Sequence, residues 1–394
     1  MLKVTALKSS AGGAGKASDY YKNEEKGPDI NNSEMLSKEQ AEKEGLEIKG
    51  SYGEYVMADR NEQTKGLSQW GGGLAKELGI EGKEVTQADL EKVFAGKLGD
   101  EQIHLGKSQD RRMGHDLTFS APKSISIMAL VGGDKRLLDA HVNAVKYTMD
   151  VMQGIVPEIR SGDGKGGIVK ESTDRTLYAM ETHSTSRAED PNIHTHALQI
   201  NMAKDKNDKL RAITMDKLYD EKLNIFGGKI YQSALRHDAE KLGYSTRSVG
   251  NGQFELKEVP QECIDVFSKR SQQIKELANQ MGASNTNTVD KIAQYNKLAK
   301  AHTDMNVLES RWNNASEEFG IKELVSNTMS KDSDKLPKQD NVKETAVTAI
   351  ERSISYLSKY NTKLKHTQIL NRALDKFSSD NLLTHKDLKS ALDT

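Results

Sequence analysis

Apolar and polar side chains alternate over MLKVTALK, residues 1–8, which predicts a β-strand with one buried face. Similar stretches predict a strand over 193–203 and a hairpin over 155–183, whose tip is the glycine-rich SGDGKGG. HDLTFSAPKSISIMAL, residues 115–130, also alternates in part, and we interpret it as two extended pieces hinged at Pro122. Strands are therefore expected at several places in the first two thirds of the chain.

Apolar residues three and four positions apart predict amphipathic helices between these strands and after them. The expected helices cover 87–96, 134–152, 229–243, much of 259–320, and three short pieces near 346–357, 369–377 and 388–392. Strands and helices alternate up to about residue 260, and helices alone follow. The pattern predicts an α+β protein with a central antiparallel β-sheet, surrounding helices and a mainly helical C-terminal part.

Composition narrows the class of protein. The 394 residues carry 57 Lys and Arg against 58 Asp and Glu, a net charge of −1, so a uniformly basic DNA-binding surface is excluded while a local basic groove is not. A single cysteine excludes a disulfide framework and a cysteine-rich zinc site. No apolar run approaches the ~20 residues of a membrane helix, and the first ten residues are too polar for a secretory signal. We expect a cytoplasmic protein without membrane insertion.

Three of the ten histidines lie within fifteen residues, in THSTSRAEDPNIHTH at 182–196. His194 and His196 are two apart, so in a strand their side chains share a face. The turn signal at Asp190-Pro191 predicts a chain reversal that brings His183 beside them. Three imidazoles on adjacent strands favour an open divalent-metal site over polar surface or structural zinc, for which a fourth ligand is missing. We expect surface positions for most other histidines, namely His104, His141, His237, His302, His366 and His385.

Two further groups carry candidate chemistry. Tyr20 and Tyr21 follow a glycine-rich turn, and a phenol becomes a nucleophile only when another group removes or shares its proton. Asp116 precedes an apolar run, where it would fix the tautomer of a metal-bound imidazole or accept the tyrosine proton. The sequence leaves both roles of Asp116 open, and it also allows the two tyrosines to be one core and one surface residue.

Five stretches together resemble the MobF class of conjugative relaxases, the amino-terminal part of relaxase–helicase proteins. They occur in the order of that family: DYY at 19–21, WGGGLAKELGIEG at 70–82, GHDLTFSAPKSISI at 114–127, HSTSRAEDPNIHTHALQINMA at 183–203 and FSKRSQQI at 267–274. The resemblance covers roughly residues 1–315. It implies a relaxase domain of the His-hydrophobe-His (HUH) nuclease fold, with a helical flap from about residue 259. Residues 316–340 would be a linker, and 341–394 a small helical segment of the kind that precedes a helicase.

By position, the resemblance makes His183, His194 and His196 metal ligands, Asp116 their acidic neighbour and Tyr20 the nucleophile, with Tyr21 as a stand-in. It implies a site- and strand-specific nick in single-stranded origin-of-transfer DNA, through a 5′-phosphotyrosine adduct that can be rejoined. It also implies accessory relaxosome proteins and a coupling protein as partners. We expect a monomer that binds Mg²⁺ or Mn²⁺, with Zn²⁺ or Ni²⁺ possible, because imidazoles accept several divalent ions. Lys123, Arg187 and Arg270 are candidate phosphate contacts because of their charge and their places in or beside the motifs.

The chain departs from the family in its second tyrosine pair. KNEEKGPDINNSEM follows Tyr21, and Tyr55 with Val56 stands where the second pair would lie. Three other functions remain open. A rolling-circle replication initiator or transposase would place its histidines before its tyrosine, and a small-molecule His-x-His metalloenzyme would need a carboxylate ligand in an apolar barrel. The third is a catalytically silent DNA-binding remnant.

Overall fold

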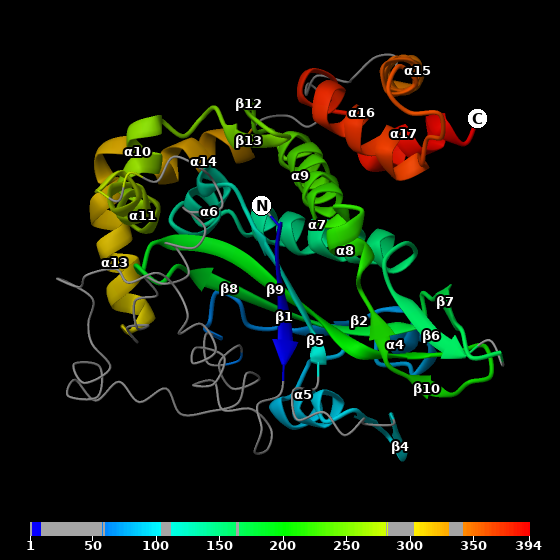
Figure 1. The fold of residues 1–394 in the computed structure, drawn as a ribbon. Coiled ribbons are helices and arrows are strands. Elements are labelled where there is room, and N and C mark those ends of the chain that lie inside the picture. Colours follow the sequence, from blue (N-terminus) through cyan, green and yellow to red (C-terminus); the bar gives the residue numbers. More distant parts are fainter. Residues whose placement is uncertain are drawn as a thin grey trace.

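The computed structural model shown in Figure 1 describes residues 2–8, 57, 60–103, 112–162, 165–280, 282, 303–330 and 342–394. Tyr20, Tyr21 and Tyr55 lie outside these ranges, so their expected roles remain predictions.

A six-stranded antiparallel sheet forms the centre of the described chain. Its strands run in the order β1-β5-β9-β8-β2, and β10 pairs with β9 outside that path. The strands are β1 (Leu2–Lys8), β5 (Arg112–Ser120), β9 (Pro191–Lys204), β8 (Thr176–Thr185), β2 (Gln69–Gly71) and β10 (Leu210–Arg211). A second sheet has the order β11-β6-β7, from β11 (Ile213–Thr214), β6 (Glu158–Gly162) and β7 (Ile168–Ser172). The hairpin predicted around SGDGKGG is thus confirmed as β6 and β7.

Each face of the central sheet packs against helices. One face carries Leu117 and Ala197 into a core shared with α6 (Lys123–Leu130), α7 (Lys135–Gln153) and α9 (Leu223–Lys241). The other face carries Leu198 into a core with α4 (Gly73–Glu77) and α5 (Gln87–Phe94). In Figure 1, α7 and α9 cover the sheet above, and α5 lies below it. Because adjacent residues on one strand enter opposite cores, the alternating pattern of β9 has a packing cause. The predicted α+β architecture with a central antiparallel sheet is confirmed.

The glycines after Trp70 are required by close packing against β8. A Cβ on Gly71 would stand 2.3 Å from the ring of Tyr178, and one on Gly72 would stand 2.3 Å from the main-chain oxygen of Thr176. Gly72 also has a φ of 110°, which disfavours other residues. The motif WGGG therefore lets β2 and α4 approach the edge of the sheet.

Several expectations about secondary structure were wrong. The piece after Pro122 is helix α6 rather than a second strand. The hairpin of β12 (Thr246–Gly250) and β13 (Gln253–Leu256) was not expected. The range predicted as a linker, 316–340, contains a 3-10 turn at Glu317–Phe319 and helix α14 (Ile321–Met329), whose Ile321 and Val325 enter the main core. The remaining strands and helices include β3 (Lys97–Leu98), β4 (Glu101–Gln102), α8 (Lys217–Asp220), α10 (Gln261–Val266), α11 (Lys269–Gln280) and α13 (Met305–Ser316).

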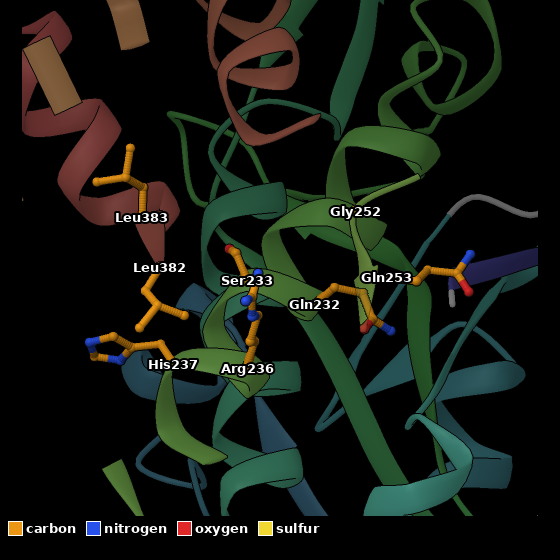
Figure 2. Close-up of a pocket in the computed structure, with 8 residues that line it drawn as sticks. All are labelled: Gln232, Ser233, Arg236, His237, Gly252, Gln253, Leu382 and Leu383. Carbon is orange, nitrogen blue, oxygen red and sulfur yellow. The ribbon is translucent and has the colours of Figure 1, made fainter. Parts of the chain in front are cut away.

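The last three helices, predicted from their spacing, are confirmed as α15 (Val342–Leu357), α16 (His366–Asn381) and α17 (His385–Leu392). They pack on α9 through a second core, and Lys229 of α9 pairs with Asp375 at 3.0 Å. Figure 2 shows a small hollow at this junction, lined by residues of α9, the β12–β13 hairpin, Leu382 and Leu383. It holds none of the three clustered histidines. No helix among the described residues is both long and apolar enough to cross a membrane.

Candidate active site

The three histidines that the sequence singles out meet at one end of strands β8 and β9. His183 of β8 lies directly opposite His194 of β9, and His196 follows two residues later on the same face. The ring centroids are 5.0 Å apart for His183 with His194, 5.0 Å for His183 with His196, and 5.3 Å for His194 with His196. One ligand atom from each ring lies within 4.8 Å of the others. The predicted juxtaposition is confirmed.

The Nδ1 atoms of two of these rings are held by oxygen acceptors of the protein. His196 Nδ1 donates to Asp116 Oδ2 at 2.7 Å, and His194 Nδ1 donates to the main-chain oxygen of Asn192 at 3.0 Å. Because a hydrogen on Nδ1 leaves the lone pair on Nε2, both rings are prepared to bind a cation through Nε2. Asp116 on β5 therefore has the tautomer-fixing position that the sequence suggested. Thr118 Oγ1 donates to the other carboxylate oxygen of Asp116, Oδ1, at 3.2 Å.

Burial keeps the His194 imidazole in a form that can bind metal. Burial, followed by the neighbouring charge of His196, lowers the pKa of His194 to about 4. His194 is therefore neutral near pH 7, as a metal ligand must be. Three imidazoles backed by a carboxylate and a carbonyl oxygen fit a divalent cation with positions left open on one side.

The short loop that joins β8 to β9 also supports the helices of the expected flap. Asp190 is buried and its Oδ2 accepts a hydrogen bond from the main-chain nitrogen of Lys269, the first residue of α11, at 3.0 Å. The main-chain oxygen of Glu189 accepts from Trp312 Nε1 of α13 at 2.8 Å. Glu189 has a φ of 59°, so the turn is tight. Helices α11 and α13 thus dock on the connection between the two strands that carry the clustered histidines.

The three predicted DNA-contacting cations lie around this loop. Lys123 Nζ donates to the main-chain oxygen of Pro191 at 2.8 Å, and burial lowers its pKa to about 8. Its ammonium therefore holds the first residue of β9 in place. Arg187 and Arg270 are half-buried. Burial lowers the pKa of Arg270, and the nearby charge of Arg187 lowers it further.

An ion pair next to the histidines was not predicted. Glu181 shares the face of His183 on β8 and is only 1% exposed. Its carboxylate accepts from Arg60 Nε at 3.0 Å and Nη2 at 2.5 Å, and from Ser68 Oγ at 2.5 Å. Position i−2 from His183 was the available signal for Glu181, but nothing local indicates that Arg60, 121 residues earlier, is its partner.

The expectation of surface positions was wrong for two other histidines. His385 is 3% exposed and its Nδ1 lies 2.9 Å from Tyr147 Oη, at the contact between α17 and α7. His141 of α7 is fully buried on the opposite face of the sheet from the three clustered histidines. The apolar periodicity of α7 carries this position inward, and that signal was available from sequence.

Comparison with known proteins agrees with this geometry. A profile of the TrwC relaxase family matches residues 14–319. Two curated relatives, both named multifunctional conjugation protein TraI, come from Escherichia coli and from Escherichia coli strain K12. They are 35% and 32% identical over 286 residues, or 69% of this chain. The chain spans only 16% of the length of either relative.

Solved structures of the conjugative relaxase TrwC are similar to this fold. A metal-bound complex with oriT DNA has a TM-score of 0.65 at 27% identity, and covers 81% of this chain and 99% of that one. A copper-bound complex with oriT DNA has a TM-score of 0.64 at 28% identity, with the same coverage. TrwC with a 27-mer comprising the recognition hairpin and the cleavage site has a TM-score of 0.60 at 31% identity, and covers 66% and 93%. With a profile match over most of its length and an HUH-type histidine cluster, this chain belongs to the TrwC relaxase family, the MobF class of conjugative relaxases.

Proposed function

We propose that this chain nicks one strand of plasmid DNA at an origin of transfer and later rejoins the ends. The observation that carries the proposal is the cluster of His183, His194 and His196, backed by Asp116, in a fold similar to TrwC bound to oriT DNA. The alternative of a small-molecule metalloenzyme needs a carboxylate ligand. Among the described residues, the cluster contains histidines alone, and Asp116 instead accepts a hydrogen bond from His196.

In the proposed reaction the phenol oxygen of Tyr20 attacks the scissile phosphorus. A bond forms from that oxygen to phosphorus while the bond to the 3′ oxygen of the neighbouring nucleotide breaks. The phenol loses its proton and the departing 3′ oxygen gains one, so the products are a 5′-phosphotyrosine link and a free 3′-OH. One phosphodiester replaces another of similar energy, so the step is reversible and requires no ATP. Tyr21 and Tyr55 are the candidates for a second transfer.

The histidines would hold a divalent cation against a nonbridging oxygen of the phosphate. A bound divalent cation supplies Lewis-acid polarisation and offsets charge that develops at phosphorus. Asp116 accepts the Nδ1 hydrogen of His196, so that the Nε2 lone pair would be available to a bound cation. We propose Mg²⁺ or Mn²⁺ as the working ion, because both suit phosphate oxygens, with Zn²⁺ or Ni²⁺ as ions that this donor set also accepts.

We also propose that Arg187 and Arg270 contact the phosphates of the bound strand. Both side chains are half-buried. The charge of Arg187 lowers the pKa of Arg270, so the two guanidinium groups lie near each other beside the loop that joins β8 to β9. Two like charges at close range attract an anion between them, and phosphate is the anion that the reaction brings. Lys123 is proposed as a third contact; its ammonium also donates to the main-chain oxygen of Pro191.

The wider setting follows the family. We propose that the chain acts as a monomer in the bacterial cytoplasm, that accessory relaxosome proteins and a coupling protein assist it, and that it accompanies the DNA into the recipient. Residues 1–315 are proposed as the relaxase domain, with a flap from about 259. Residues 341–394 are proposed as a small helical segment of the kind that precedes a helicase.

The deciding experiment detects the covalent intermediate. The protein is incubated with Mn²⁺ and single strands that carry the candidate nick site and a label at the 3′ end, so that the label stays with the protein. We expect a labelled protein band, and mass mapping should place the nucleotide on Tyr20. Tyr20→Phe should abolish the band and preserve strand affinity, because only a hydroxyl is lost, whereas Tyr21→Phe is the matched control. An undiminished band in Tyr20→Phe would reassign the nucleophile, and its absence from the wild type on every strand would refute the function.

A further inference from the structure

A buried chain of hydrogen bonds lies behind the three clustered histidines, on the α7 side of the sheet. His141 Nδ1 is 2.7 Å from Tyr231 Oη of α9, and His141 Nε2 is 2.8 Å from Thr195 Oγ1 of β9. Thr195 Oγ1 is in turn 2.8 Å from Thr182 Oγ1 of β8. All four side chains are buried, so these bonds form without competition from bulk water.

The two threonines occupy the positions that determine where the histidines stand. Thr195 is the residue between His194 and His196, and Thr182 directly precedes His183. Thr182 and Thr195 are directly opposite each other in the β8–β9 register, immediately before the opposed pair His183 and His194. A bond between the two hydroxyls thus joins the ligand strands at the point where they must hold a fixed separation.

His141 fits this place because it bonds in two directions at once. Burial lowers its pKa to about 3, so the ring is neutral and has one donor and one acceptor nitrogen. One nitrogen therefore engages the phenol of Tyr231 and the other engages Thr195, which links the helix layer to the ligand strands. Phe119 and the edge of His141 also pack against the Tyr231 ring, with centroids 5.3 and 5.6 Å away.

We propose that His141, through Thr195 and Thr182, is a positioning residue for the metal site. Its two hydrogen bonds go to Tyr231 and Thr195 rather than to a clustered histidine, and it acts by holding the backbone of β9 and β8 so that the three imidazoles converge before metal arrives. This inference depends on the proposed metal site. Groups that orient ligands from behind typically contribute 10–100-fold to metal affinity. Because His141 is one step further away than Asp116, we expect the lower end, about tenfold.

The test measures the affinity of the metal-free protein for Mn²⁺ by calorimetric titration, with the melting temperature of the metal-free form recorded for each variant. Thr195→Val keeps the shape of the side chain and removes its bonds, and should weaken binding about tenfold. His141→Leu should do the same, and His141→Gln, whose amide nitrogen can take the place of Nε2, should recover most of the affinity. Tyr231→Phe supplies a variant that loses one hydroxyl only, if His141→Leu does not fold.

Thr148→Val is the matched control. Thr148 is also fully buried, and its hydroxyl donates to the Ala144 main-chain oxygen within α7 at 2.8 Å. Its loss should lower stability and leave Mn²⁺ affinity unchanged. Equal affinity in Thr195→Val and wild type would overturn the positioning role alone, as would an equal loss in Thr148→Val or no recovery in His141→Gln. The metal site itself is refuted, together with this inference, if the wild type does not bind Mn²⁺ or if His194→Ala binds it equally well.

Discussion

Replacing Asp116 with asparagine separates the two roles that this carboxylate could have. Asp116 is 4% exposed and its Oδ2 lies 2.7 Å from His196 Nδ1, so it makes a short, charge-assisted bond away from water. Such a bond contributes ~1.5–3 kcal/mol, against ~0.5–1.5 kcal/mol for a neutral one. The asparagine oxygen can still accept from Nδ1. A metal on Nε2 makes the Nδ1 hydrogen more acidic and so strengthens the bond to a carboxylate more than the bond to a neutral amide; we take the lost gain as about 1–1.5 kcal/mol. Since 1.4 kcal/mol is tenfold, Mn²⁺ affinity should fall by about tenfold.

The assay has two stages, metal titration and then adduct formation at saturating Mn²⁺. If Asp116 acts through His196 alone, excess metal should restore the rate of adduct formation to near the wild-type value. A rate that stays low when the site is full would show that the carboxylate also takes the tyrosine proton. Asp134→Asn is the matched control, because Asp134 is a carboxylate only 1% exposed that binds Arg136 at the start of α7. Unchanged Mn²⁺ affinity in Asp116→Asn would refute the tautomer argument.

Two further predictions concern stability. Burial lowers the pKa of His385 to about 4 from an ordinary 6.5, so the unfolded chain binds a proton that the folded one excludes, and stability should fall as pH drops from about 6.5 to about 4. At ~1.36 kcal/mol per pKa unit, the free energy of unfolding should fall by up to about 3 kcal/mol. Denaturant unfolding at several pH values should show a smaller fall in His385→Gln. An equal pH dependence in the variant and the wild type would contradict the assignment. Arg60→Ala leaves the buried carboxylate of Glu181 without its cation and should cost ~3–5 kcal/mol. In urea unfolding, Glu181→Gln in the same chain should recover part of that cost, and a loss below about 1 kcal/mol would disprove the pairing.

The histidine site was predictable because its information is local. His183, His194 and His196 lie within fourteen residues, and a period of two with one turn places them on a shared face. For Asp116 the sequence left two roles open. Its contact with His196 depends on the pairing of β5 with β9, which lie about 80 residues apart in the chain. The Arg60–Glu181 pair and the hydrogen bonds of His141 to Thr195 and Tyr231 could not be predicted either, because their partners are also far apart in the sequence.

Helix α6 shows how a distant residue overrides a local pattern. SISIMAL alternates like a strand, but the helix begins after Pro122, where a proline can precede a helix. The carboxylate of Glu255 on β13 accepts from the main-chain nitrogens of Lys123 at 3.3 Å and Ser124 at 2.8 Å. These are helix-end donors that otherwise need a local cap. The β12–β13 hairpin itself was predictable, because Asn251-Gly252 is a strong turn signal between its strands.

The loop at Glu189 and Asp190 serves two structures at once. On one side it sets the separation of the strands that bear His183 and His194, and on the other it provides the acceptors for α11 and α13. The docking of α11 and α13 and the affinity of the three imidazoles for a cation are therefore thermodynamically linked. If a bound cation stabilises the docking of these helices by some free energy, docking of the helices must strengthen cation binding by the same free energy.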